Sequence, residues 1–404
     1  MKLVLACLLG GSAGWAADRR VKLALACLLG GSAGWAMTAP GAGAPVLASG
    51  YGAGLLWVGL LTSALAFPYA ALQFPSGVLV DRFGVRATAV TGLSLVVVAH
   101  VAALVAPLPW LAVGARFASG AGFAVCFVCG TSLARDSGTG PRGMGIFGGV
   151  ALAASGFAVL VVPFASLVLG WRAAWATTLA VVLPALVLSA LSPGGSARRV
   201  SPRGAGSVRD GQLFRLAAVH AATLGLGVVL SSWATTLLTD IWNFSSAVAA
   251  VVGSAVLGLS VLSRPLGGHI AALWPGLSRT VWVVALVACA AATIALSWRS
   301  TPVVAVLAVI TLGMFSGLPF ASVVSAGQAR LPERPAAAVG LTNTAAFGLV
   351  VAATPIVGWA ADHGYASWTL VAVAALWLLP LTALPRIAAP TPQPLPDART
   401  PSTF

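Results

Sequence analysis

The chain has 404 residues, of which 59% are hydrophobic and only 7% are charged. A soluble domain usually carries about a quarter charged residues, so this composition excludes an ordinary water-soluble protein and indicates a polytopic membrane protein. The net charge of +14 would suggest a nucleic-acid partner in a soluble chain. Here the arginines stand in short clusters between apolar stretches, which is typical of membrane topology signals, so we expect no nucleic-acid partner.

The only lysines are Lys2 and Lys22. A P-loop needs a lysine beside the nucleotide phosphates. Nothing after residue 22 supplies one, so this chain contains no P-loop ATPase, and energy for uphill transport would come from a gradient or from another subunit. The Cys126-x-x-Cys129 pair lies in an apolar stretch, where two thiols on one helical face indicate packing rather than a zinc or redox site. We expect neither a metal nor another cofactor.

The N-terminus contains a tandem repeat. Residues 2–16 and 22–36 differ only at Val4 and Ala24. The first copy is short for a membrane span, and bulky Trp15 disfavours signal-peptide cleavage after Ala17. We therefore expect residues 1–20 to be a dispensable duplication, or a misplaced start, that lies loosely or along the membrane surface.

Stretches of about 20 mostly apolar residues predict an all-α integral membrane protein with twelve transmembrane helices. The predicted spans are residues 22–44, 53–75, 87–106, 109–132, 144–168, 171–192, 213–237, 246–264, 280–298, 302–325, 336–360 and 366–388. The even-numbered connections and the tails hold 19 of the 22 Lys and Arg residues. Positive residues mark the cytoplasmic side, so both termini are predicted to be cytoplasmic in an inner (plasma) membrane.

The longest connection, residues 193–212, is basic and rich in Gly and Ser, as flexible linkers are. It separates a bundle over 21–192 from a second over 213–390, and residues 391–404 are expected to be a disordered cytoplasmic tail. The two halves echo each other 192 residues apart: Gly148, Gly156 and Pro163 match Gly340, Gly348 and Pro355. Two pseudo-symmetric six-helix bundles of this kind are typical of transporters that bind substrate between their halves.

The connection after the second span reads GVLVDRFGVR, residues 77–86. Gly77 is expected to let helices approach, and Gly84 to adopt a backbone conformation that other residues resist. Asp81 stands among arginines at a helix end, where it can pair with Arg82, Arg86 or the positive end of a neighbouring helix. The alternative is an ordinary charged loop that stops a helix.

This motif resembles the G-x-L-x-D-R-x-G-x-R signature of the major facilitator superfamily. The matching positions are Gly77, Leu79, Asp81, Arg82, Gly84 and Arg86. The resemblance implies a gate element that stabilises the outward-open state, in a transporter that works by alternating access.

A second stretch in the fourth span, ARFASGAG, resembles the superfamily's R-x-x-x-G-x-G motif through Arg116, Gly120 and Gly122. The resemblance implies that Arg116 faces the central cavity and takes part in proton or substrate coupling. A lone arginine in a span normally faces a cavity or a partner. The alternative is that Arg116 snorkels to the outer headgroups.

The equivalent loop of the C-terminal half, SRPLGGHIAAL at 263–273, keeps Arg264, Gly267 and Gly268 but has Ala272 in place of the acid. RPLGG bears a weak resemblance to the cyanate and nitrate/nitrite porter branches. The second span carries no charge, and Arg264 falls at the predicted cytoplasmic end of span eight. Both facts argue against a two-arginine anion clamp.

Two further polar residues fall in C-terminal spans. His220 is either a proton site or a packed histidine, and Asn343 either binds substrate or joins helices. We assign no role to His100, which falls near an outer helix end, or to His363, which falls in an outer loop. No carboxylate lies in mid-span, so the coupling ion is left open.

The sequence therefore predicts a monomeric secondary transporter in the lipid bilayer. The leading interpretation is uptake of a small solute, an anion being a candidate, with protons as the coupling ion. The alternatives are a proton-coupled drug or metabolite efflux antiporter and a non-transporting membrane receptor or scaffold on the same fold. No span or loop gathers a nucleophile, a base and an orienting acid, so we do not expect an enzyme.

Deleting residues 1–20 should leave expression, topology and transport near the levels of the full chain, because the second copy supplies a complete first span. Reporter fusions at the two termini measure the topology, and membrane yield measures the expression. Loss of insertion or an inverted topology would show that the first copy is a working part.

Overall fold

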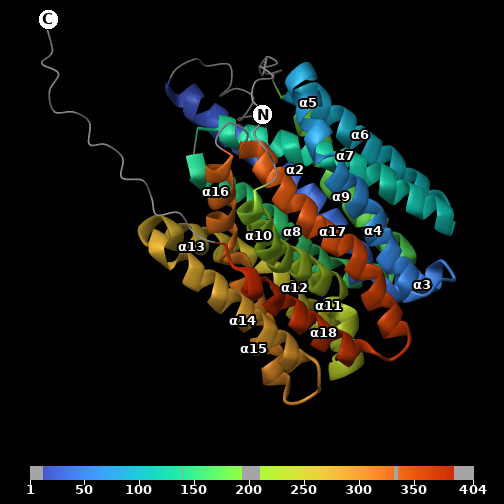
Figure 1. Ribbon diagram of the computed structural model, residues 1–404. Helices are drawn as coiled ribbons and strands as arrows, with labels where there is room; N and C mark the ends of the chain where they lie inside the picture. The colour runs from blue at the N-terminus through green and yellow to red at the C-terminus, as the bar shows by residue number, and fades with distance from the viewer. Residues whose placement is uncertain (1–11, 139, 193–209, 332–334, 386–404) are drawn as a thin grey trace, which may run out of the picture.

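The computed structural model describes residues 12–138, 140–192, 210–331 and 335–385, and within these ranges every regular element is a helix (Figure 1). The α-helices are α2 (Ser12–Ala42), α3 (Ala44–Gly50), α4 (Leu55–Ala71), α5 (Gln73–Phe83), α6 (Val85–Val105), α7 (Pro109–Asp136), α8 (Gly140–Leu169), α9 (Ala173–Leu191), α10 (Gly211–His220), α11 (Gly227–Trp242), α12 (Ser246–Gly258), α13 (Ser260–Leu273), α14 (Ser278–Leu296), α15 (Pro302–Gly317), α16 (Phe320–Arg330), α17 (Pro335–Asp362) and α18 (Ala366–Leu378). Four shorter helical turns are η1 (Gly170–Arg172), η2 (Ala221–Leu226), η3 (Pro275–Leu277) and η4 (Leu379–Ala383). Most of the predicted linker and the whole of the predicted tail lie outside the described residues.

The prediction of twelve membrane-spanning helices is confirmed. In the described part of the chain, ten helical runs are long and apolar enough to cross a bilayer, and α4 joins them when it is taken with α3, from which it is bent by 103°. The 49-residue run Gly143–Leu191 contains two crossings, α8 and α9. Prolines inside helices do not end them, as at Pro163 and Pro355, because membrane helices have no competing water and neighbouring groups satisfy the freed carbonyls.

Among the predicted boundaries that differ from the structure, two concern the motif stretches. The second span does not end at residue 75, since α5 carries it on to Phe83, and the eighth continues past residue 264 to Leu273. Both stretches carry polar residues that lower the local hydropathy without interrupting the backbone pattern. The stretches predicted as gate loops are therefore largely helical.

The duplicated N-terminal segment is partly described. Residues 12–20 belong to α2, a continuous helix of 31 residues, so the expectation of a loose segment is wrong for them. Residues 1–11 lie outside the described part of the chain. Whether the segment is dispensable stays a prediction.

The helices form two bundles, α2 to α9 and α10 to α18, that meet along three lines of contact (Figure 1). Helix α17 lies along α4, α8 lies along α12 and α13, and α2 contacts α11. We call the end where α9 ends and α10 begins the linker end. The opposite end, with α3 and the turn between α17 and α18, is the far end.

Glycines allow the two bundles to approach closely. Gly156 of α8 lies against the backbone of α12 at Ser254 and Gly258, and Gly59 of α4 lies against α17 at Pro355. A methyl group at either glycine would overlap main-chain atoms of the other bundle. Small residues at membrane helix interfaces permit this kind of van der Waals packing.

The predicted echo between the halves is only partly a structural equivalence. Pro163 and Pro355 both lie within long helices, α8 and α17. Gly156 packs against the other bundle, whereas its counterpart Gly348 has open space where a side chain would stand. The two halves thus use corresponding helices but not the same glycine contacts.

Candidate functional site

Within the motif at residues 77–86, the backbone turn between two helices is made at Gly84. Its φ of +80° ends α5 and begins α6, as the sequence predicts. Thr88 Oγ1 donates to the Gly84 carbonyl oxygen at 2.6 Å and fixes the turn. Among the described side chains nothing lies within 4 Å of where a Gly77 side chain would be, so the expectation that Gly77 lets helices approach stays a prediction.

The charged residues of this motif lie at the linker end. Arg82 and Arg86 are exposed, and the Arg82 guanidinium lies 5.2 Å from the centre of the neighbouring Phe83 ring. Leu79 is also exposed. The side chain of Asp81 lies outside what the structure describes, so its gating role stays a prediction.

A carboxylate that the sequence analysis did not single out links two helices at the same end. Asp210 accepts from Arg330 Nη1 of α16 at 2.9 Å and caps α10 by accepting from the Gln212 N–H at 2.9 Å. The pKa of Asp210 is held below its usual range, mainly by the hydrogen bond from the Arg330 guanidinium and to a smaller extent by the one from the Gln212 N–H. The side chains are 28% exposed for Arg330 and 31% exposed for Asp210. We therefore interpret the pair as a partly exposed salt bridge that joins α10 and α16 at the linker end, and not as a buried site.

Arg116 lies inside the N-terminal bundle with only 1% of its surface exposed. Its Nε donates to the carbonyl oxygen of Leu61 on α4 at 3.1 Å, while Nη2 has no partner within the described residues. Gly120 and Gly122 let α7 approach α4 and α6 so closely that a side chain at either would overlap the neighbouring backbone. Snorkelling to the headgroups is therefore wrong, and access to a central cavity stays a prediction.

His100, to which the sequence analysis assigned no role, is fully buried beside Arg116. Its Nδ1 lies 3.0 Å from the Val96 carbonyl oxygen and 3.2 Å from Ser119 Oγ, and its ring meets Trp175 edge-on at 5.4 Å. The Val96 oxygen can only accept, which favours a proton on Nδ1. This grouping could not be predicted from the sequence, because the neighbours of His100 come from three different spans.

The predicted C-terminal candidates come together. His220 Nε2 lies 3.1 Å from Asn343 Oδ1, which can only accept, so Nε2 donates. The Arg264 guanidinium lies 3.7 Å from the centre of the Phe320 ring, and that ring is 6.0 Å from the His220 ring. We call these four residues, His220, Arg264, Phe320 and Asn343, the interface cluster.

The interface cluster reaches across to the N-terminal bundle. Arg264 Nη1 donates to the carbonyl oxygen of Gly148 on α8 at 3.3 Å. Arg264 is only 6% exposed, and neither its Nε nor Nδ1 of His220 has a partner within the described residues. The expectation that Arg264 lies at a cytoplasmic helix end is wrong, because α13 continues past it and Gly267 packs tightly against Leu318. A methyl group at Gly268 would stand 3.4 Å from the side chain of Ala321, an ordinary contact.

Aromatic rings form a wall beside the interface cluster. Phe347, one turn after Asn343 on α17, meets Tyr69 of α4 at a ring-centre distance of 4.6 Å. Tyr69 meets Phe127 at 5.9 Å, and Phe127 meets Phe147 at 5.2 Å. Phe147 adjoins Gly148 in sequence, but its ring packs inside the N-terminal bundle against Gly30 and Gly130. Of these ring pairs, Tyr69 with Phe347 is the one that crosses between the bundles.

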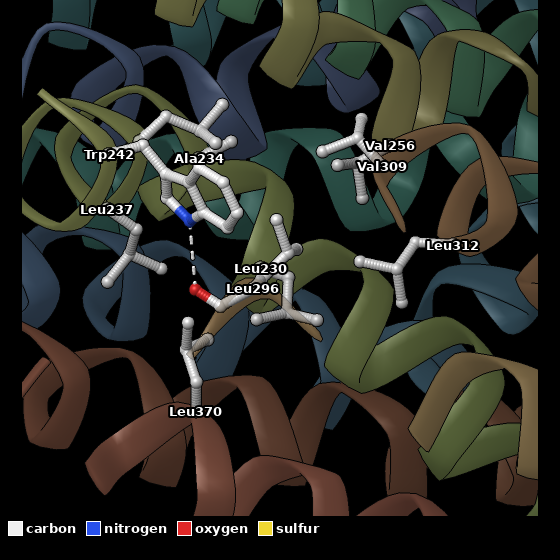
Figure 2. Close-up of a pocket in the computed structure, with 10 residues that line it drawn as sticks. Leu230, Ala234, Leu237, Trp242, Val256, Leu296, Val309, Leu312 and Leu370 are labelled. Carbon is white, nitrogen blue, oxygen red and sulfur yellow. Dashed lines mark hydrogen bonds between the residues drawn. The ribbon is translucent and has the colours of Figure 1, made fainter. Parts of the chain in front are cut away.

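Neither of two apolar hollows in the structure includes the polar candidates. Figure 2 shows one of about 20 Å³ inside the C-terminal bundle, where Trp242 Nε1 donates to the Leu296 carbonyl oxygen at 3.0 Å. It has room for little more than one water, and its lining is almost entirely alkyl and aromatic carbon. The other, about 250 Å³, is a groove on the outer surface between α6 and α7, lined by residues such as Val98 and Trp110. We assign substrate to neither.

Comparison with known proteins decides the family. Residues 24–355 match the Major Facilitator Superfamily. The chain belongs to this superfamily. By sequence it matches none of the curated proteins. Membership makes it a membrane transporter for small molecules and indicates that it is not an enzyme.

Two solved structures of superfamily transporters share its fold at low sequence identity. A point mutant of the nucleoside transporter NupG gives a TM-score of 0.72 at 12% identity, with 91% of this chain and 98% of that chain covered. The human organic anion transporter MFSD10 (TETRAN) gives 0.66 at 15% identity, with 90% and 99% covered. These similarities extend the superfamily fold over nearly the whole chain and leave the substrate to the chain's own residues.

In a cysteine-free background, the Arg116→Cys variant should react with a small charged thiol reagent only while the transporter cycles, because residue 116 is enclosed here. The Phe117→Cys variant is the matched control, since Phe117 is 50% exposed on the outer surface of the bundle. It should react with a membrane-soluble maleimide and not with the charged reagent. If position 116 reacts with neither reagent under any condition, Arg116 is a packing residue and not a cavity residue.

Proposed function

We propose that this superfamily member takes up a small anionic solute together with protons, and that the interface cluster binds the anion. The observation that carries the proposal is the buried guanidinium of Arg264, which no carboxylate of the described residues contacts. A buried charge without a counter-charge is costly, and in a membrane protein it marks a substrate or ion pathway. An anion at this position would supply the missing charge.

The neighbours of Arg264 favour a small planar anion. Stacking on Phe320 holds the guanidinium in one plane and leaves its Nε free to donate. The rings of Tyr69 and Phe347 meet across the bundle interface, one helical turn from Asn343. The N–H groups of a single fixed guanidinium, placed beside flat rings, suit a solute with one anionic group. The organic anion transporter MFSD10 shows that the fold serves anions, and NupG that it serves nucleosides.

His220 is the residue through which we couple this anion to a proton. Its ring and the Arg264 guanidinium both pack against the Phe320 ring, so the guanidinium charge acts on the imidazole at short range. Its Nδ1 has no partner within the described residues and can accept a proton. An anion bound at Arg264 would offset that charge and favour a proton on His220. Binding of the two would then be mutually favourable, which is the thermodynamic requirement for symport.

We further propose an inner-membrane protein with the linker end in the cytoplasm and both termini on that side. The distribution of Lys and Arg supports this orientation. Under it, an inward proton gradient drives uptake. We propose a monomer, because each chain carries both bundles that form the site.

Replacing Arg264 with Gln should lower uptake of the transported anion about 10- to 100-fold, the cost of losing one or two hydrogen bonds to a charged group. Arg264→Lys should rescue poorly, because an ammonium lacks the planar face that stacks on Phe320. Arg135→Gln, on an exposed arginine at the linker end, is the matched control.

Cyanate, nitrate and short carboxylates are the first anions to test. Their binding is measured by thermal stabilisation of the purified protein, and their transport by flux into proteoliposomes. Wild-type affinity for neutral solutes alone would contradict the proposal.

Replacing His220 with Gln should uncouple transport from the proton gradient while exchange of anion across the membrane continues. The amide keeps a donor for Asn343 but cannot be protonated. We expect counterflow of the anion within about threefold of wild type. We expect no accumulation of the anion under an inward pH gradient, because its binding is no longer coupled to binding of a proton. Undiminished pH-driven accumulation in this variant would exclude His220 as the coupling residue, and an outward net flux in the wild type would indicate efflux.

A further inference from the structure

A carboxylate from the C-terminal bundle caps a helix of the N-terminal bundle at the far end. Asp362 is the last residue of α17, and its two oxygens accept from the main-chain N–H groups of Leu55 and Leu56, each at 3.1 Å. These are the first two residues of α4. The contact joins positions about 307 residues apart in sequence and exists only while the two bundles meet at this end.

Helix α4 needs this contact because it has no local cap. The first N–H groups of any helix lack partners within the helix, and a carboxylate also matches the positive end of the helix dipole. The residue at the N-cap position is Gly54, which has no side chain to accept these bonds. A side chain at Gly54 would stand 2.9 Å from Asp362 Oδ2, so glycine also makes room for the carboxylate.

The same two helices continue to interlock inward from Asp362. Gly358 lies tightly against the Leu55 carbonyl. Ser63 Oγ donates to the Val351 carbonyl oxygen at 2.7 Å, and Thr354 Oγ1 lies 3.2 Å from the Gly59 carbonyl oxygen. Separating the bundles at the far end would break all of these contacts, and Asp362 is the outermost.

Asp362 depends on no cation for this role. Within the described residues no arginine or lysine forms an ion pair with it. His363, its neighbour in sequence, turns away to bond the Trp359 carbonyl oxygen at 2.8 Å and to stack on the Trp359 ring at 4.6 Å. The partner of the carboxylate is therefore the helix terminus itself.

We propose that Asp362 is a gating residue of the transport cycle that holds the far end shut by capping α4. Opening toward the far end leaves the Leu55 and Leu56 N–H groups without this acceptor. The contact thereby stabilises the far-closed state and sets how often the far end opens. This inference goes beyond the proposed substrate and proton coupling and depends on neither of them, because it needs only the alternating access of the superfamily.

The experiment measures opening directly, without substrate or gradient. Ser232 of α11 is 1% exposed and lies under Gly41 of α2 at the interface, so Ser232→Cys in a cysteine-free chain reports separation of the bundles. Labelling by a charged thiol reagent added from the far side should be about 3- to 30-fold faster in Asp362→Ala than in the parent, the ratio expected for losing a helix cap. Asp362→Asn should be intermediate, since its one remaining oxygen can still accept.

Two further variants serve as controls for the labelling experiment. Asp240→Asn removes the charge of another exposed far-end carboxylate, which forms no ion pair within the described residues, and should leave labelling unchanged. Gly54→Ala keeps the acid but crowds it out of its place, and should raise labelling in the same direction as Asp362→Ala. If Asp362→Ala fails to fold, as judged by its thermal transition, Gly54→Ala carries the test alone. Parent-like labelling in the folded variants, or an equal rise in Asp240→Asn, overturns the proposal.

Discussion

Backbone N–H and C=O groups inside a bilayer find no water, so every one of them must be paired within the protein. A continuous helix meets this requirement by itself, and a broken helix does not. In this transporter three of the four residues of the interface cluster stand close to helix breaks. Arg264 follows the break between α12 and α13, Phe320 begins α16, and His220 ends α10 just before the π-helical turn η2. Breaks free backbone groups and widen the spacing between side chains, which is why binding residues gather there.

The same constraint explains the two contacts that cross between the bundles with charged groups. At the interface cluster, a guanidinium of one bundle meets a carbonyl of the other, Gly148. At the far end, a carboxylate meets the unpaired N–H groups of α4. In each case a charged group contacts main chain and not an opposite charge. Such contacts leave the charge able to respond when a ligand or water replaces the partner.

Much of the fold could be predicted from the sequence because hydropathy and charge distribution are local properties. Twelve spans, two halves and the turn at Gly84 follow from them. Helix ends did not follow: the polar stretches around Asp81 and Arg264 lower the hydropathy, but the backbone stays helical through both. A hydropathy scan measures how apolar a stretch is, whereas the helix continues as long as its hydrogen bonds are made.

The candidate site was predictable residue by residue, but not as an arrangement. His220, Arg264 and Asn343 each stand out as a polar side chain in an apolar span. Their assembly around Phe320 depends on four helices from distant parts of the chain, and Phe320 itself is one of 15 phenylalanines with no distinguishing neighbourhood in sequence. Asp362 was invisible for the same reason, since its partner is a helix terminus and carries no side-chain signal at all.

The choice of arginine at 264 fits this arrangement better than lysine would. A guanidinium can stack flat on Phe320 and still present edge N–H groups toward both Gly148 and an incoming anion. An ammonium is a compact, strongly hydrated charge that would lose more hydration on burial and gain less from the ring. The bond to Gly148 is long at 3.3 Å, so the anion that we propose would compete for that donor against a weak partner. Under this proposal, anion binding and release of the contact between the bundles would depend on the same side chain, which would link occupancy of the site to the movement of one bundle against the other.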